Sequence, residues 1–428
     1  MSVTTASDLD GRLRALFASD PDAMADPYAV LGELRAVAGV HSLDAMTLIS
    51  RHAEVRRASR DAERLSSATY TGTRASAALA RYDDRQRDAY RVVSEFESRY
   101  VSRSDGEQHG RLRRIMQRAF TPRRMAEMEV RVRSICDELL DDLALADTPD
   151  LVPFAWRLPL LVVGELLEVP RGDIGRIHEW SSAIGRNRRG VDPDALMPAL
   201  DAIAEFREYV EMLVADHRGT EHQSGLLTAL LGAGDEHRLS AEELTATFVI
   251  LLFAGHETTT GLLTNGMLEL LRHPEQWRAL CADPGLAGPA TEELLRFVSP
   301  VQWTWRVAAR PYEVAGTVLP AGTTVGLLLA AANRDPEVFS DPETLDLRRA
   351  DAGRHLAFGL GPHFCIGNAL ARLEAEIAFG RLAQRFPGMT LGSDPIRWRG
   401  NAMMRQVHEL HVSLGAADDS QPKRGAQQ

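Results

Sequence analysis

The chain has 428 residues, of which 44% are hydrophobic and 25% charged, and its formal net charge is −11. This length allows a large buried core, in one unit or two. The acidic balance argues against a nucleic-acid partner, and three widely separated cysteines give no disulfide framework, which fits a reducing cytoplasm.

The first ten residues carry two acidic side chains and no apolar run, so we expect neither a secretory signal nor a membrane anchor there. The most apolar run, 248–255, is shorter than the ~18 residues that a membrane span needs. We therefore expect a cytoplasmic protein that does not contact a membrane.

Helical periodicity dominates the chain, after a helix predicted over 27–36 and a short strand over 47–50. Further helices are predicted over 107–143, 158–167, 194–217, 241–271 and 287–297. Short strands return over 307–319 and 324–328, between turns at Gly316, Pro320 and Gly322. The tail 416–428 is polar and predicted to be disordered. The fold class is mainly α with small β-sheets (α+β).

The helix predicted over 241–271 turns from apolar to polar in its middle, at Ala254, Gly255, Glu257 and Thr258. A glycine inside a helix costs roughly 1 kcal/mol relative to alanine, and a threonine hydroxyl can bond to the carbonyl four residues earlier. Such a site could hold a water molecule. Taken alone, the segment is equally well explained as an amphipathic helix whose polar face begins here.

The segment 358–367 places one cysteine, Cys365, among glycines that allow a tight turn, and a helix-forming run follows it. The helix N-terminus favours a thiolate. No second cysteine or histidine stands at zinc spacing, which favours an axial ligand to haem iron over structural zinc. A lone cysteine is usually a small core residue, but Phe358 and the glycines favour the ligand.

The pattern F-x-x-G-x-x-x-C-x-G over 358–367 resembles the haem-binding loop of the cytochrome P450 family, and Ala-Gly-x-Glu-Thr over 254–258 resembles the oxygen-activating groove of its long central helix. Segments 25–28, 120–122 and 331–336 are also similar to this family, in its bacterial soluble form. The resemblance implies a triangular, helix-rich prism with haem between the central helix and the Cys-loop helix. It also implies a single domain over 25–415, after an N-terminal extension over 1–24.

The resemblance implies haem b with Cys365 as thiolate ligand, and it assigns cofactor contacts to Ala254, Gly255, Phe358 and Gly359 and propionate contacts to His109, Arg113, Arg306 and His363. Glu293 and Arg296, three residues apart on one helical face, are assigned a structural role. One departure is Asp105-Gly106-Glu107, where the family often has a double proline, which leaves the local turn open.

The implied activity is that of a monooxygenase, in which Thr258 donates a hydrogen bond and steadies a water while Glu257 connects that water to bulk protons. The chain has no flavin or iron–sulfur motif, so electrons from NAD(P)H are expected through a separate ferredoxin and ferredoxin reductase. An acidic partner could dock on a cluster of five arginines, namely Arg111, Arg114, Arg118, Arg123 and Arg124. The same cluster is equally well explained as the solvated face of a helix. We expect a monomer.

The segment 301–306 is predicted to be extended, which places Gln302 and Thr304 on the same face as Arg306, turned towards the pocket. We add Met403 to the pocket and assign 67–104, with Tyr70 and Tyr82, to its roof. The substrate would be a small secondary-metabolite or peptide-derived molecule. Two alternatives stay open: oxidative coupling or desaturation without oxygen insertion, and a haem-thiolate ligand-binding sensor, which Glu257 and Thr258 disfavour.

Overall fold

A computed structural model describes residues 6–118, 120–187, 193–218, 226–231 and 239–415, so the tail predicted over 416–428 lies outside the described residues. Within these ranges the helices are α1 Ala6–Phe17, α2 Pro21–Ala25, α3 Pro27–Val37, α4 His52–Arg60, α5 Thr73–Leu79, α6 Asp84–Glu97, α7 Gly106–Gln117, α8 Pro122–Ala144, α9 Leu151–Leu166, α10 Ile174–Asn187, α11 Pro193–Arg218, α12 Leu226–Leu231, α13 Ala241–Arg272, α14 Pro274–Ala282, α15 Ala287–Val298, α16 Leu329–Ala332 and α17 Asn368–Arg385. The strands are β1 Val40–Leu43, β2 Met46–Ile49, β3 Leu65–Ser66, β4 Thr304–Ala308, β5 Tyr312–Val314, β6 Thr317–Leu319, β7 Thr324–Leu327, β8 Thr390–Leu391, β9 Trp398–Arg399, β10 Gln406–Val407 and β11 Val412–Ser413. The prediction of a mainly α fold with small sheets is confirmed.

The helices with the strongest sequence signals, α13 and α15, begin at the predicted residues and end one residue later than predicted. A capping box fixes the start of α13, because Ser240 accepts a hydrogen bond from the Glu243 N–H and Glu243 reaches back to the Ser240 N–H. The end of α15 is marked by Ser299, whose φ of 41° lies in the left-handed region.

Two helix predictions were wrong in their bounds. The helix predicted over 107–143 is two helices, because Pro122 stands in the first turn of α8 and Thr121 caps it by accepting a hydrogen bond from the Arg124 N–H. The helix predicted from 158 starts at Leu151, after Asp150 accepts a 2.9 Å hydrogen bond from the Val152 N–H. Most of α9 is buried, so its sequence shows no polar face that would mark the helical period.

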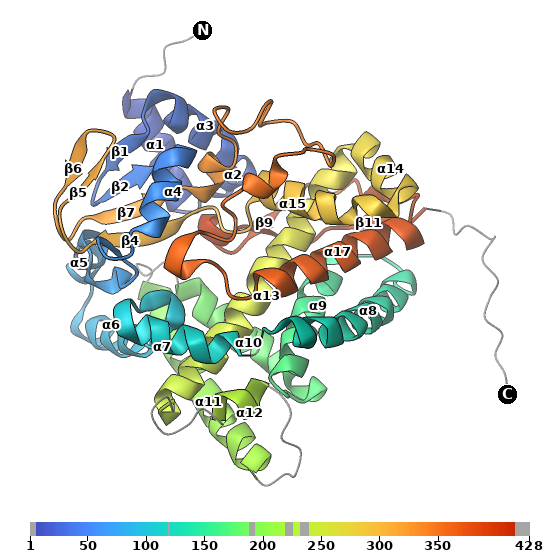
Figure 1. The fold of residues 1–428 in the computed structure, drawn as a ribbon, viewed down its shortest axis with the longest axis horizontal. Coiled ribbons are helices and arrows are strands. Elements are labelled where there is room, and N and C mark those ends of the chain that lie inside the picture. Colours follow the sequence, from blue (N-terminus) through green and yellow to red (C-terminus); the bar gives the residue numbers. More distant parts are fainter. Residues whose placement is uncertain (1–5, 119, 188–192, 219–225, 232–238, 416–428) are drawn as a thin grey trace, which may run out of the picture.

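The main sheet has the strand order β1-β2-β7-β4-β3, in which β2 and β7 are parallel and the other neighbours antiparallel. The central strand β7 is buried at every position. Figure 1 shows this sheet at one side of the molecule and the long helix α13 crossing the middle. The sheet matters for the site because β4 carries Arg306.

Helix α1 packs against the same body as the sheet. Its side chains Leu9, Leu13 and Leu16 are buried in one hydrophobic cluster with Leu48 and Trp303. Residues 6–24, predicted as an extension, therefore contribute apolar side chains to the core.

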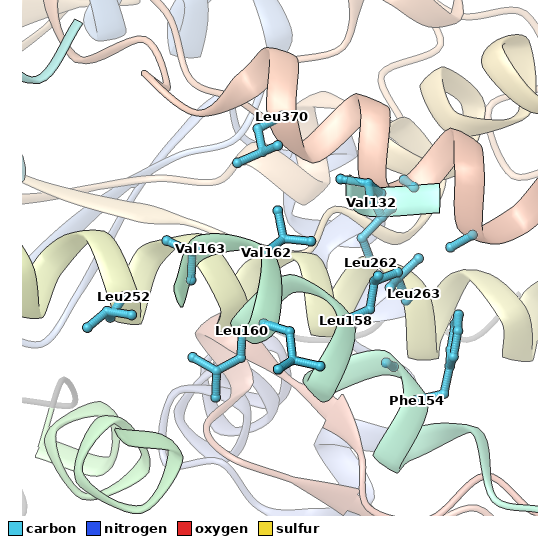
Figure 2. Packing of buried hydrophobic residues seen from close by; sticks show 14 of the residues in the cluster. Val132, Phe154, Leu158, Leu160, Val162, Val163, Leu252, Leu262, Leu263 and Leu370 are labelled. Atoms are coloured by element: carbon cyan, nitrogen blue, oxygen red, sulfur yellow. The ribbon is translucent and has the colours of Figure 1, made fainter. Parts of the chain in front are cut away.

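Helix α13 is the centre of the larger core and contacts α9, α11, α15 and α17. Figure 2 shows Leu158, Val162 and Val163 of α9 packed near α13. Leu370 of α17 lies on one side of α9, and Leu160 points to the other side. Within the described residues, α13 has the length and apolar composition of a possible membrane span, yet 78% of its most apolar window is buried inside the protein. We assign it to the core.

Candidate active site

The loop before α17 is built around Cys365. Its amide donates a 3.0 Å hydrogen bond to the carbonyl of Phe358, and its carbonyl accepts one of 2.7 Å from the Asn368 side chain. Gly359 and Gly361 have φ values of 65° and 74°. A Cβ on Gly361 would also lie 2.8 Å from the Ser59 carbonyl oxygen, so only glycine fits where the loop passes α4.

Burial and nearby donor or positive groups act in opposite directions on the pKa of the Cys365 thiol. Burial raises the pKa of this thiol, although the Gly367 N–H, Arg113 and Arg372 act in the opposite direction. The thiolate at the N-terminus of α17 stays a prediction, because the burial effect is that of the sulfur without a metal ion beside it. A metal ion at the sulfur would deprotonate the thiol outright.

The four residues predicted to bind propionates lie together beside this loop. The rings of His109 and His363 are 4.3 Å apart, and Arg113 donates a 2.8 Å hydrogen bond to the carbonyl of Phe364. Arg306 lies close enough for its charge to lower the pKa of His363, after the larger effect of burial. Helix α7, strand β4 and the Cys365 loop thus supply these groups from three separate parts of the chain.

These residues fit a cofactor with carboxylate groups. Nε2 of His109 is buried without a hydrogen-bond partner, and burial lowers the pKa of His109 to about 4. Arg306 is buried with its pKa lowered to about 10, and it donates to the Thr304 hydroxyl and the Trp305 carbonyl. The described residues place no carboxylate in salt-bridge contact with Arg306, so an anionic ligand would compensate its buried charge.

The turn before α7, left open by the sequence, is formed by Asp105 and Gly106, whose φ is 57°. The Asp105 carboxylate accepts hydrogen bonds from the Ser66 hydroxyl at 2.6 Å and the Ser67 N–H at 2.9 Å. It also lies 3.2 Å from Nε2 of His363. Asp105 is therefore an acidic member of the site that the sequence analysis did not assign.

The middle of α13 offers an open surface in an otherwise buried helix. Ala254 is exposed, and Thr258 is half-buried one turn later. The Thr258 hydroxyl donates a 2.9 Å hydrogen bond to the Ala254 carbonyl. In this arrangement its hydrogen is engaged by the helix and its oxygen can accept from a water, and the donor role predicted for Thr258 stays a prediction. Gly255, by contrast, faces α9. A Cβ at this position would lie 3.2 Å from the Val163 side chain, so the glycine allows the two helices to pack closely.

Glu257 is held by Gln406, a residue that the sequence analysis missed. Nε2 of Gln406 donates hydrogen bonds to the carbonyl of Glu257 at 2.7 Å and to its Oε2 at 2.9 Å. Burial acts to raise the pKa of Glu257, but His256, Arg399 and Gln406 outweigh it and hold the pKa at about 2. Glu257 is therefore ionised at neutral pH. Gln406 lies on β10, 149 residues away, and no local pattern could have indicated it.

Glu374 of α17 is a second buried carboxyl group, fully enclosed beside Thr259 of α13. Burial raises its pKa to about 8, although a hydrogen bond with Thr259 acts in the opposite direction. The Oε1 atom of Glu374 has no hydrogen-bond partner. A neutral carboxyl group thus lies where the Cys-loop helix packs on the central helix.

The Glu374→Gln variant should change how stability depends on pH. Between pH of about 4.5 and about 8 the folded chain keeps a proton that the unfolded chain releases, so the free energy of unfolding falls as pH rises through this range. Glutamine removes this fall, and urea unfolding at several pH values would measure it. Glu376→Gln, exposed on the same helix, is the matched control. An unchanged pH dependence in Glu374→Gln would contradict the assignment.

Glu293 and Arg296 form a buried ion pair in α15, with both side chains 0% exposed. Arg296 donates to both carboxylate oxygens of Glu293, at 2.7 and 2.8 Å, and also to the carbonyls of Asn333, Pro342 and Thr344. The pair therefore ties α15 to the loop that follows α16, as the structural role predicted for it requires.

The structure corrects the expectation for Gln302 as a pocket residue. Its side chain is fully buried, and its Nε2 donates to the carbonyls of Val298 and Ser299 at 2.9 and 2.6 Å. The chain leaving α15 exposes carbonyls that this amide satisfies, which the extended pattern could not show. Thr304 is half-buried but accepts a hydrogen bond from Arg306, and Met403 is half-buried against the cluster around α1.

The segment 67–104 contains α5 and α6 and lines a polar pocket against the sheet. Tyr70, Arg74 and Trp305 belong to this pocket, and the Arg74 guanidinium lies 4.9 Å from the Trp305 ring. Tyr82 is buried and packs on Tyr90 instead, with ring centroids 6.0 Å apart. The arginine cluster also differs from the expectation, because Arg111 forms an ion pair with Glu243 of α13.

We compared the sequence and the structure with those of known proteins. The model of the family "Cytochrome P450" matches residues 192–283 and 290–397. The cytochrome P450 monooxygenase PikC of Streptomyces venezuelae is 39% identical over 91% of this chain and 92% of its own length. The 6-deoxyerythronolide B hydroxylase of Saccharopolyspora erythraea is 40% identical over 73% of this chain and 77% of its own. A crystal structure of P450BioI in complex with a fatty-acid-ligated acyl carrier protein has a TM-score of 0.83, 30% identity, and covers 92% of this chain and 99% of that chain. The chain therefore belongs to the cytochrome P450 family and is a haem-thiolate monooxygenase.

Proposed function

We propose that this protein hydroxylates a small secondary-metabolite or peptide-derived molecule, with electrons from NAD(P)H delivered by a separate ferredoxin and ferredoxin reductase. The observation that carries the proposal is the ionised Glu257 next to the Thr258 hydroxyl, one turn from the exposed Ala254. A relative whose name describes hydroxylation of 6-deoxyerythronolide B supports the substrate class.

Haem, held through the Cys365 thiolate, supplies the redox chemistry of dioxygen when it is bound. His109, Arg113, Arg306 and His363 would hold its propionates, because they gather the unpaired Nε2 of His109 and positive charge at one place. Asp105 adds a negative charge beside His363, which partly offsets the attraction that these groups exert on a carboxylate.

Two consecutive residues of α13 would handle protons. Thr258 presents its hydroxyl oxygen to a water, because its hydrogen is donated to the Ala254 carbonyl. Glu257 is ionised and fixed by Gln406, so its carboxylate can accept a hydrogen bond from a solvent-connected water and link that water to bulk protons. Gln406 acts by positioning the carboxylate.

The Thr258→Ala variant should bind haem normally but form about tenfold less product per NAD(P)H consumed, with the missing electrons recovered as hydrogen peroxide. Alanine keeps the helix but removes the oxygen that holds the water. The test is a coupled assay with a surrogate ferredoxin and reductase, in which NAD(P)H, peroxide and product are measured together. Thr245→Ala is the matched control, because Thr245 makes the same bond, to the Ala241 carbonyl at 3.0 Å, and is buried. Unchanged coupling in Thr258→Ala would contradict the proposal.

The same assay separates the candidate functions by product mass. A gain of one oxygen supports hydroxylation, whereas a loss of two hydrogens indicates coupling or desaturation. Substrate binding without any product would favour a sensor.

Positively charged side chains near the ends of α7 and α8 support an acidic electron-transfer partner. Arg114 and Arg118 are exposed at the end of the helix that carries His109 and Arg113, whereas Arg123 is paired with Glu127. In a protein with a net charge of −11, such a local basic surface would orient an acidic ferredoxin.

A further inference from the structure

Helices α10 and α13 bring together three side chains of metal-binding type, His178, His256 and Glu257. One nitrogen of each histidine and one carboxylate oxygen of Glu257 lie within 4.8 Å of one another. Two imidazoles and one carboxylate are the protein ligands of one common class of zinc site. The propionate and Cys365 residues described above are not part of this group.

The two ring nitrogens of His256 face different oxygen atoms, Nδ1 the Leu252 carbonyl and Nε2 the Glu257 carboxylate. Nδ1 of His256 lies 2.6 Å from the Leu252 carbonyl, which can only accept, so Nδ1 carries a hydrogen. Nε2 lies 3.3 Å from Oε1 of Glu257. In the neutral ring it is a lone pair facing that oxygen, whereas a proton on Nε2 makes the ring a donor to the carboxylate, which is the arrangement that lowers the pKa of Glu257. Two buried acceptors at this distance repel each other unless a cation lies between them.

His178 supplies a third donor from a different helix. Its Nδ1 is buried without a hydrogen-bond partner. Its ring stacks on Trp156 of α9, with a centroid distance of 4.3 Å and an interplanar angle of 14°, which fixes the plane of the imidazole. Gln406 holds Oε2 of Glu257 and leaves Oε1 for the cluster. Such outer contacts orient ligands in metal sites.

A proton on His256 is the simplest alternative cation. The resulting imidazolium would donate to Glu257 and account for that pair, but it would leave the buried Nδ1 of His178 unexplained. The positive charge of Arg399 on β9 lowers the pKa of both Glu257 and His178. This charge disfavours any further cation beside these two residues, whether a proton on a histidine or a metal ion. The convergence of three donors, rather than the pair alone, favours a metal ion.

We propose that His178, His256 and Glu257 form a binding site for one divalent transition-metal ion of the zinc type. The ion has access, because His178 is half-buried and the Glu257 side chain is 15% exposed. An ion here would hold the carboxylate that the proposed function uses for proton transfer. Metal binding would then slow product formation, a consequence that depends on the proposed function, whereas the binding itself does not.

The test uses the haem-loaded full chain, freed of metal by dialysis against a chelator and titrated with zinc chloride in a calorimeter. We expect one zinc ion per chain, and at least about tenfold weaker binding in His178→Ala and in His178→Gln, since each removes a ligand. The matched control is His411→Ala, which removes a half-buried histidine paired with Asp394 at 2.9 Å. It should leave the affinity unchanged.

Zinc K-edge absorption of the same sample identifies the ligands without any activity measurement. Two nitrogen ligands and one oxygen ligand at about 2.0–2.2 Å would support the site. His256 is fully buried and its replacement risks misfolding, so His178, on the more accessible side, carries the decisive comparison.

Absence of stoichiometric zinc, or binding that survives in His178→Ala but is lost in His411→Ala, would overturn the proposal. A chain that bound zinc here but formed no hydroxylated product would refute the proposed function alone.

Discussion

Cys365→Ala is expected to abolish the red-shifted absorption band that the reduced carbon monoxide complex of a haem-thiolate protein shows. Alanine cannot donate the thiolate charge that gives this complex its spectrum. The variant should fold, because the loop is also held by main-chain hydrogen bonds such as that from residue 365 to the Phe358 carbonyl. The measurement is the difference spectrum of reduced protein with and without carbon monoxide, with circular dichroism as the folding check.

Cys281→Ala is the control for this spectrum. Cys281 is half-buried on α14, and its sulfur lies 3.9 Å from the carbonyl oxygen of Pro387. Its replacement should leave the band intact. A normal band in Cys365→Ala, or its loss in Cys281→Ala, would remove Cys365 from the cofactor site.

Glu293→Gln is expected to lower the free energy of unfolding by about 3–5 kcal/mol, the usual cost of leaving one member of a buried ion pair without its partner. Arg296 would keep its charge at 0% exposure, and Arg349 would lose the carboxylate oxygen that lies 3.1 Å from its Nε. The Asp346 N–H also donates to this carboxylate, over 3.0 Å. Urea unfolding of the haem-loaded protein measures the loss.

An exposed pair at similar spacing provides the comparison. Glu127 lies 3.1 Å from Arg123 on the surface of α8, and Glu127→Gln should cost no more than about 0.5 kcal/mol. Equal losses in Glu293→Gln and Glu127→Gln would show that burial does not set the strength of the α15 pair.

The sequence was informative where local chemistry determines the structure. Helix α13 was predicted closely because its capping residue Ser240 and its long apolar run are continuous in the chain. The loop around Cys365 was predicted because its glycines are required by backbone geometry, as the φ of Gly361 and the approach of Ser59 show.

The sequence was less informative where distant residues decide a side chain's environment. Gln302 was expected in the pocket, yet two carbonyls of the preceding chain take its amide. The contact between Gln406 and Glu257 joins β10 to α13 across 149 residues, and no periodicity encodes it. The burial that raises the pKa of the Cys365 thiol is likewise set by the whole fold, and the loop sequence alone did not indicate it.

The packing of α1 has a practical consequence for anyone who shortens this protein. Leu13 and Leu16 are fully buried against a cluster that includes Trp303, and Phe17 meets the Trp303 ring edge-on at 4.7 Å. A truncation at residue 25 would leave the indole and its neighbours facing water, on the segment that leads into β4 and Arg306. Expression vectors should therefore retain the first two helices, because they cover Trp303, which stands one residue before the strand that carries Arg306.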